Sequence, residues 1–374
     1  MEPLKQAAQE GVVITCADGW QWCIYPIPAA FKGDWPEQCA MASTDESSCP
    51  VCEQDYEHRS DYPNLAHLHN PTNTLKALRR YDRSKDMEEL KGLGLKPWWP
   101  WWADIPFTNF HMSIMPDLLH QLYQGLIKMH AIAWSQKVIS KSKLNQCFKS
   151  MPKAAGMRHF SKGISKIQQW TGRESKEMAK QLLPIIAGQG VNSNFIALIQ
   201  SITNFTFRVH QSWMTDSEVN ELECSLLLLH EKKSVLKTLK IYKLLKSLNH
   251  VKKLHMASHY SRLIREMGTL DGYSTEGLEH LHMIYTKRGW HASNKVKPLP
   301  QMIKFIQRYE AIRIHRVYMN IYYKLPDREW VDSRVVYGKD EDAIAEDGVN
   351  YNLWDDESGK DGTKVQWNPN NGGE

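Results

Sequence analysis

Two pairs of potential metal ligands stand far apart in this chain. Cys49 and Cys52 are separated by two residues, which lets both sulfurs face one tetrahedral ion at about 2.3 Å. His255 and His259 are four residues apart, so on a helix both imidazoles lie on one face. The four residues predict a structural Cys₂His₂ zinc site that closes a loop of roughly two hundred residues and offsets its entropy. The alternatives are two buried thiols and an unrelated pair of histidines.

A second informative stretch combines many tryptophans with a motif that follows them. Residues 98–106 read WWPWWADIP, and residues 115–125 read MPDLLHQLYQG. Shorter motifs stand in a fixed order around them: DWPEQ (34–38), CPVC (49–52), RHF (158–160), QWTG (169–172), KLH (253–255) with HY (259–260), GYSTEG (272–277) and ASNK (292–295). Over residues 11–315 the chain resembles the Plavaka transposases, fungal proteins encoded by DNA transposons of the CACTA superfamily.

The resemblance implies a fold class and a reaction. The fold is α+β and mostly helical, with an RNase H-like core that is split by a large all-helical insertion. Such a protein acts on DNA in the nucleus. Its reaction needs two divalent ions, Mg²⁺ or Mn²⁺, held by an Asp-Asp-Glu set of carboxylates. One ion activates the attacking oxygen and the other stabilises the leaving 3′ oxygen.

Three carboxylates are candidates for the catalytic set. The resemblance makes Asp34 the second aspartate, although it lies in a short turn where its side chain could instead bond to its own backbone. The resemblance makes Glu276 or Glu279 the closing glutamate. Both share one helix face, so either could reach the metals if that helix packs beside the strands; we prefer Glu276. A helix-capping role is the alternative for these glutamates, since Ser274 and Thr275 precede them.

The first aspartate of the set has no candidate in the sequence. Only 33 residues precede Asp34, and among them Asp18 belongs to a predicted turn. In the family pattern the first aspartate lies further upstream of the second than these residues reach. We therefore expect an N-terminally truncated relative, or a gene fragment, with an incomplete metal site. Asp117 and His120 belong to a family motif of uncertain role. They form either a pair that supports the metal ligands or contacts DNA, or a helix N-cap followed by a packed histidine.

The elements that must position these residues change in kind along the chain. Residues 12–15 and 21–25 flank an Asp-Gly dipeptide and predict a β-hairpin. Apolar residues then recur at helical spacing, with a capped start at Thr215 and Glu218, a long helix over 226–248 and a last helix over 299–323. The predicted domains are a partial RNase H-like strand region with the Cys-x-x-Cys knuckle (1–115), a helical insertion (116–268), C-terminal helices that complete the core (269–325) and a disordered acidic tail (326–374).

Charge is unevenly distributed. The net charge is +5, but residues 338–374 hold ten acidic residues against three lysines, so this tail carries −7 and the rest +12. A basic body suits a protein that neutralises phosphates, although proteins that bind no anion share it.

No stretch has the length and apolar character of a signal peptide or a membrane span, so we expect a soluble intracellular protein. Self-association into a homo-oligomer stays open.

Three functions fit these patterns. The first is a transposase-derived DNA-binding protein that is catalytically incomplete. The second is an active metal-dependent transposase or nuclease that takes the missing aspartate from a rearranged strand. The third is a zinc-stabilised interaction module whose basic body binds an acidic partner. For the four tryptophans at residues 98–102 we favour a core plug between the strand region and the insertion over stacking on unpaired bases.

Overall fold

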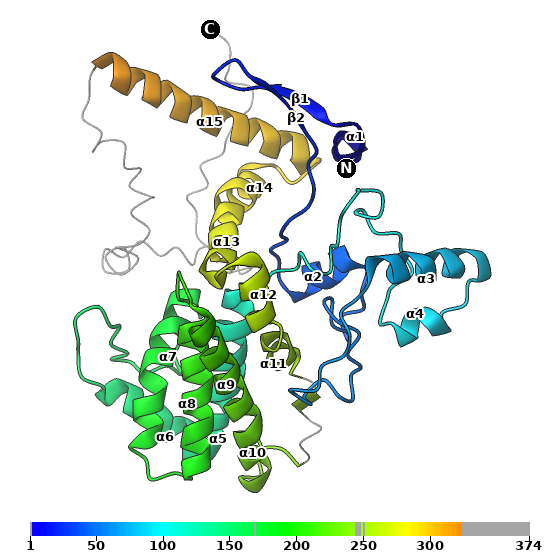
Figure 1. Cartoon of the computed structure of the whole chain (residues 1–374). Coiled ribbons are helices and arrows are strands. Elements are labelled where there is room, and N and C mark those ends of the chain that lie inside the picture. The colour runs from blue at the N-terminus through cyan, green and yellow to red at the C-terminus, as the bar shows by residue number, and fades with distance from the viewer. Residues whose placement is uncertain (1, 168–169, 244–247, 250, 324–374) are drawn as a thin grey trace. The chain divides into compact units, whose positions relative to one another are not determined.

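The computed structural model describes residues 2–167, 170–243, 248–249 and 251–323 of the 374-residue chain. The described residues are mostly helical, as predicted (Figure 1). Contacts divide the chain into two compact units, Met1–Glu276 and Gly277–Glu374. The predicted acidic tail (326–374) lies outside the described residues, and the four predicted domain ranges stay predictions.

The first unit begins with a short helix and a hairpin and continues as helices joined by loops. Its elements are α1 (Glu2–Glu10), β1 (Val12–Thr15), β2 (Gln21–Ile24), α2 (Trp35–Ala42), α3 (Pro71–Ser84), α4 (Glu88–Gly92), η1 (Leu118–Ile132), α5 (Ala133–Ile139), α6 (Lys141–Ser150), α7 (Gly172–Ala187), α8 (Ser193–Arg208), α9 (Asp216–Lys232), α10 (Val235–Thr238), α11 (Lys252–Ala257), α12 (Tyr260–Met267) and η3 (Leu270–Tyr273).

The predicted hairpin is confirmed. Strands β1 and β2 pair antiparallel, with Val12 opposite Ile24 and Thr15 opposite Gln21. Gly19 in the turn has a φ of +86°, a conformation that glycine adopts without steric cost. Both strands expose their side chains, and this hairpin is the one named sheet among the described residues. The RNase H-like core therefore remains a prediction.

A helical core fills most of the rest of this unit. Between residues 116 and 267 the described part of the chain contains helices and loops and no strand, as the apolar spacing predicts. The main apolar cluster joins η1, wound as a π-helix, to α7, α8 and α9. Thr215 and Glu218 form the predicted capping box at the start of α9.

The predicted helix over residues 226–248 is wrong. Helix α9 starts at Asp216 and ends at Lys232, and the short α10 follows it. The break has a packing cause: Val235 and Leu236 turn into the core, and the Lys233 ammonium donates to the carbonyl of Ser60. Buried contacts with distant parts of the chain thus override a run of residues with good helix propensity.

The second unit consists of short helices followed by a long one. Helix α13 (Glu276–His282) crosses the boundary between the units, and η4 (Met283–Lys287), α14 (Arg288–Ala292) and α15 (Pro298–Tyr323) follow it. Helix α15 matches the predicted last helix. Gly289 packs against Met302 of α15, where an added Cβ would lie 3.5 Å from the methionine Cβ. Of the helices that the structure describes, none has the length and apolar character needed to cross a membrane.

Candidate metal centre and the converging carboxylates

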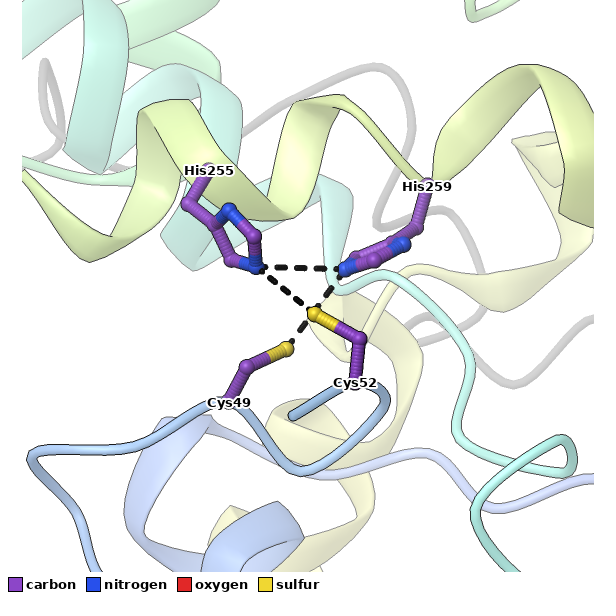
Figure 2. A group of neighbouring side chains, drawn as sticks. All are labelled: Cys49, Cys52, His255 and His259. Atoms are coloured by element: carbon purple, nitrogen blue, oxygen red, sulfur yellow. Dashed lines mark hydrogen bonds between the residues drawn. The ribbon is translucent and has the colours of Figure 1, made fainter. Parts of the chain in front are cut away.

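The four predicted zinc ligands come together in one buried group. Cys49 and Cys52 lie on the loop between α2 and α3, whereas His255 lies in α11 and His259 just before α12. All four are at most 2% exposed, and their ligand atoms lie within 4.8 Å of one another. Figure 2 shows the two sulfurs and two imidazole nitrogens directed toward a common centre.

The distances within this group fit a tetrahedral zinc ion. The Cys52 sulfur lies 3.2 Å from His255 Nε2, and the Cys49 sulfur lies 3.5 Å from His259 Nε2. The two Nε2 atoms are 3.3 Å apart. Bonds of about 2.3 Å to sulfur and about 2.0 Å to nitrogen place S and N ligands about 3.5 Å apart and two N ligands about 3.3 Å apart. The residues therefore fit zinc in number, type and spacing.

The surroundings of the group favour the thiolate form of Cys52. The pKa of this thiol is lowered, chiefly by a hydrogen bond from Cys49, and further by the backbone of Gln54 and the positive charges of Arg59 and Arg262. Cys39, which is also buried but lies outside the group, shows the opposite: burial raises its pKa to about 12. Thiolates are the form that binds metal, so the group differs from an ordinary pair of buried thiols.

Arg59 is an unusual neighbour of the ligands. Its side chain is 3% exposed, and its three guanidinium nitrogens have no hydrogen-bond partner among the described residues. A buried cation without a partner is costly unless a negative charge lies near it. The sulfur of Cys52 lies near enough for its thiolate to supply such charge, and the pKa of Cys52 is lowered by Arg59 in turn.

Two further histidines hold the cysteine loop in place. His69 Nε2 donates to the carbonyl of Cys49 at 3.0 Å, and His111 Nδ1 donates to that of Pro50 at 2.9 Å. Burial lowers their pKa values to about 4 and about 3, so both imidazoles are neutral at pH 7. The hydroxyl of Thr74 then donates to His111 Nε2 at 3.2 Å. The sequence contains both histidines but gives no spacing signal for this role.

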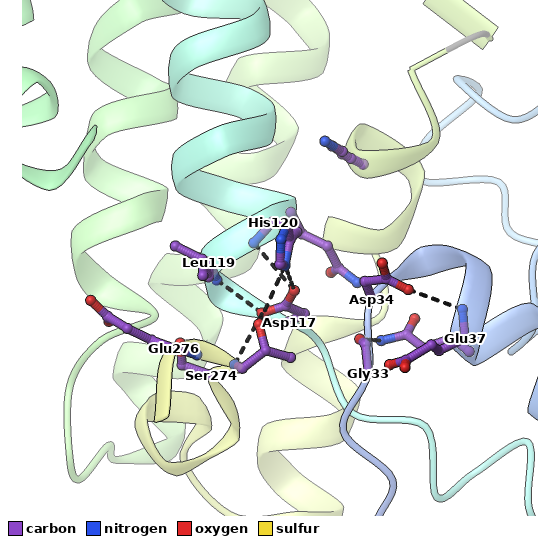
Figure 3. Close-up of polar contacts among 12 residues, drawn as sticks. Gly33, Asp34, Glu37, Asp117, Leu119, His120, Ser274 and Glu276 are labelled. Carbon is purple, nitrogen blue, oxygen red and sulfur yellow. Dashed lines mark hydrogen bonds and ion pairs between the residues drawn. The ribbon is translucent and has the colours of Figure 1, made fainter. Parts of the chain in front are cut away.

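Asp34, the predicted second catalytic aspartate, caps helix α2. Its side chain accepts a hydrogen bond from the backbone N–H of Glu37 at 3.0 Å. The buried Gln38 of this helix donates to the carbonyls of Gly33 and Met115, each at 2.9 Å. The turn that carries Asp34 is therefore fastened to the chain that leads into η1 (Figure 3).

Asp117 is the most heavily hydrogen-bonded carboxylate of this region. It caps η1 by accepting from the backbone N–H groups of Leu119 and His120, and it also accepts from the imidazole of His120. Thr275 donates to it from its backbone at 3.2 Å and from its hydroxyl at 2.8 Å. Burial alone would raise the pKa of this 1% exposed side chain, but the donors from His120 and Thr275 outweigh it and lower the pKa.

Glu276 follows Thr275 at the start of α13. Its backbone N–H donates to the Ser274 hydroxyl, and its carboxylate pairs with Lys176 of α7 at 2.6 Å. Ser274 thus acts as the cap that the sequence offered as the alternative. Glu279 lies on the same helix but in the second unit, so the structure does not place it relative to Asp34.

Three segments that are distant in sequence meet around these carboxylates. Phe31 exchanges backbone hydrogen bonds with Ser113 and Met115, at 2.7 and 3.0 Å. Lys32 donates to the carbonyl of Gly272 and lies over the Tyr273 ring. The segments that carry Asp34, Asp117 and Glu276 are therefore neighbours, although only the Cys₂His₂ residues form a ligand group among the residues described.

Comparison with known families shows what the first part of the chain is similar to. Residues 1–135 match the family model of the Plavaka transposase. The match contains Asp34, the Cys-x-x-Cys loop, the tryptophan cluster and the Asp117-x-x-His120 motif. It confirms the Plavaka resemblance for these residues and supports a transposase-derived protein; over residues 136–315 the resemblance stays a prediction. Comparison with curated proteins gives no match.

The tryptophan cluster of the Plavaka-like region contains one buried residue, Trp102, one partly buried residue, Trp101, and two exposed ones. Trp102 is 1% exposed, stacks on Phe110 and donates to the carbonyl of Met41 at 3.0 Å. It also belongs to the apolar cluster that contains Met256, so the predicted core plug is confirmed for this residue. For Trp98 and Trp99, which are 43% and 44% exposed, the core prediction is wrong.

Proposed function

We propose that this chain is a zinc-stabilised, transposase-derived DNA-binding protein that does not complete the transposition reaction by itself. The observation that carries the proposal is the Plavaka match over residues 1–135. The charge of +12 outside residues 338–374 supports a DNA partner, because lysine and arginine release counterions condensed on the duplex. A nuclear location and an RNase H-like core are the further properties that this function would require.

Zinc has a structural role in this proposal. Its four ligands close the coordination sphere, so no position is left for water or substrate. They join the loop before α3 to α11 and α12, across more than two hundred residues of sequence. The ion would thus fix one end of the helical part relative to the segment that carries Asp34.

Catalytic incompleteness is supported by what the carboxylates do in the fold. Asp34 caps α2, Glu276 is paired with Lys176, and both oxygens of Asp117 accept hydrogen bonds. A two-ion reaction needs carboxylates that bridge both metals and stabilise entering and leaving oxygens together. We therefore expect Mg²⁺ or Mn²⁺ to serve as a catalytic cofactor only if the alternative function, an active transposase, is correct.

DNA binding should depend steeply on salt. We expect the affinity for duplex DNA to fall by a factor of about 10 or more between low and physiological ionic strength, because most contacts would be electrostatic. Fluorescence anisotropy with a labelled duplex across a salt series measures this. A dissociation constant that stays the same across the series would contradict the proposal and favour the interaction-module function.

The active transposase is the second candidate, and the convergence of the segments that carry Asp34, Asp117 and Glu276 favours it. We expect no nicking or strand transfer with Mg²⁺ or Mn²⁺ on DNA from the surrounding locus. The matched control is the Asp34→Ala, Glu276→Ala double variant, which should behave like the parent. Activity in the parent that the double variant lacks would overturn incompleteness and make the chain a working transposase.

A further inference from the structure

The exposed tryptophans line one side of a groove. Its volume is about 580 Å³, and it lies between the C-terminal end of α3 and residues 97–99. Leu78 and Tyr81 of α3 lie on the other side. We call this feature the α3–Trp groove. It is a surface site, distinct from the buried metal ligands and from the converging carboxylates.

Cations lie over the aromatic rings of this groove. The Arg79 guanidinium is 5.4 Å from the Trp99 ring centre, and the Lys96 ammonium is 5.0 Å from that of Trp98. The ammonium of Lys85 lies 5.4 Å from the Tyr81 ring. The groove therefore combines flat apolar faces with positive charge within a few ångströms of each face.

The charge of the groove is positive. Arg79, Arg83 and Lys85 line it together with one acidic residue, Asp82, which pairs with Lys85 at 2.6 Å. Arg79 and Arg83 have no ion pair among the residues that the structure describes. An anionic ligand would consequently meet two uncompensated guanidinium groups, each able to hold a phosphate through two parallel hydrogen bonds.

The helix that presents these cations is held rigidly. Arg80, on another face of α3, donates from Nε to Glu89 of α4 at 2.8 Å. Beneath the helix, a small apolar core packs α3 against α4 and the chain that follows. It consists of Ala77, Leu78, Leu90 and Leu95. The binding surface is thus preorganised, which lowers the entropy cost of binding.

We propose that the α3–Trp groove binds a single-stranded nucleic acid by stacking its unpaired bases on Trp98 and Trp99, a proposal that rests on the DNA-binding function. Stacking yields about 1–3 kcal/mol per base, whereas an exposed cation–π contact yields about 0.5–1 kcal/mol. A base can therefore displace Arg79 or Lys96 from its ring and leave the cation for the adjacent phosphate. In a duplex the base faces already stack on each other, so the tryptophans would gain nothing there.

The test compares single and double strands with matched tryptophan variants. Binding of a labelled oligothymidine and of a duplex of the same length is measured by fluorescence anisotropy. For the double variant Trp98→Ala, Trp99→Ala, which we call the groove variant, we expect at least about a tenfold weaker affinity for the single strand. Its affinity for the duplex should change by no more than about twofold. The control double variant, Trp20→Ala, Trp213→Ala, removes two tryptophans that are 72% and 68% exposed elsewhere, and should leave both affinities unchanged.

Each outcome decides a separate point. If the parent binds the duplex, but the groove variant keeps full affinity for the single strand, the groove proposal fails and the DNA-binding function stands. If the parent binds neither nucleic acid, both fail. Polyglutamate serves as a third probe, measured in the same way. If the groove variant loses affinity for polyglutamate and not for oligothymidine, the groove proposal fails and the groove is a site for an acidic peptide. Circular dichroism and thermal melting confirm that both double variants are folded.

Discussion

Replacing Cys49 by serine or His259 by alanine should abolish stoichiometric zinc binding and lower the free energy of unfolding by at least about 4 kcal/mol. The reason is that zinc, once bound, contributes its binding energy to the folded state alone. Each variant also leaves the remaining ligands buried without their ion, beside the Arg59 guanidinium, which has no hydrogen-bond partner among the described residues. Metal analysis of the purified protein and urea unfolding measure the two effects.

The matched control for this prediction is Cys39→Ser. Cys39 is 1% exposed like the ligand cysteines, but it is not part of the ligand group. The Cys39→Ser variant should keep one zinc per chain. Its free energy of unfolding should fall only by the cost of placing a polar hydroxyl at a buried position. Full zinc content and an unchanged melting temperature in both ligand variants would refute the site. Equal zinc loss in all three variants would point to unfolding rather than to ligation.

The ligand set was predictable from sequence because its two halves each carry a local signal. A Cys-x-x-Cys pair and a histidine pair four residues apart constrain geometry within a single turn or helix, whatever surrounds them. The supporting shell has no such signal. His69 and His111 act on backbone carbonyls, and any buried histidine with the right approach could do the same. Their role follows only from the tertiary structure.

The same distinction explains the fold. The hairpin, the capping box at Thr215 and the last helix depend on neighbouring residues, and the structure confirms all three. The break after Lys232 and the division between Trp102 and its exposed neighbours depend on which distant segments cover each residue. Sequence spacing carries no information on that coverage. The predicted helix over residues 226–248 was therefore wrong, and the predicted core position of the tryptophans held only in part.

Asp117→Ala should destabilise the protein by roughly 3–5 kcal/mol, more than any other carboxylate substitution considered for this region. The change removes the acceptor for Leu119, His120 and Thr275 at once and leaves the donors of Leu119 and Thr275 buried. Asp34→Ala removes one helix cap at a half-buried position and should cost about 1 kcal/mol. Urea unfolding of the two variants beside the parent measures the contrast.

The pH dependence separates the charge of Asp117 from its hydrogen bonds. Since the folded pKa lies below the ordinary aspartate value of about 3.9, the stabilisation by the ionised form is complete above that pH and is lost as the pH falls through the folded pKa. Asp117→Asn keeps the size of the side chain but cannot ionise. Its deficit relative to the parent should therefore be largest near neutral pH and shrink with acidification. Two results would contradict this role of Asp117. One is a loss of unfolding free energy in Asp117→Asn that is the same at every pH, and the other is an equal loss in Asp34→Ala and Asp117→Ala. Either would show that the ionised carboxylate of Asp117 does not hold the start of η1 to Thr275.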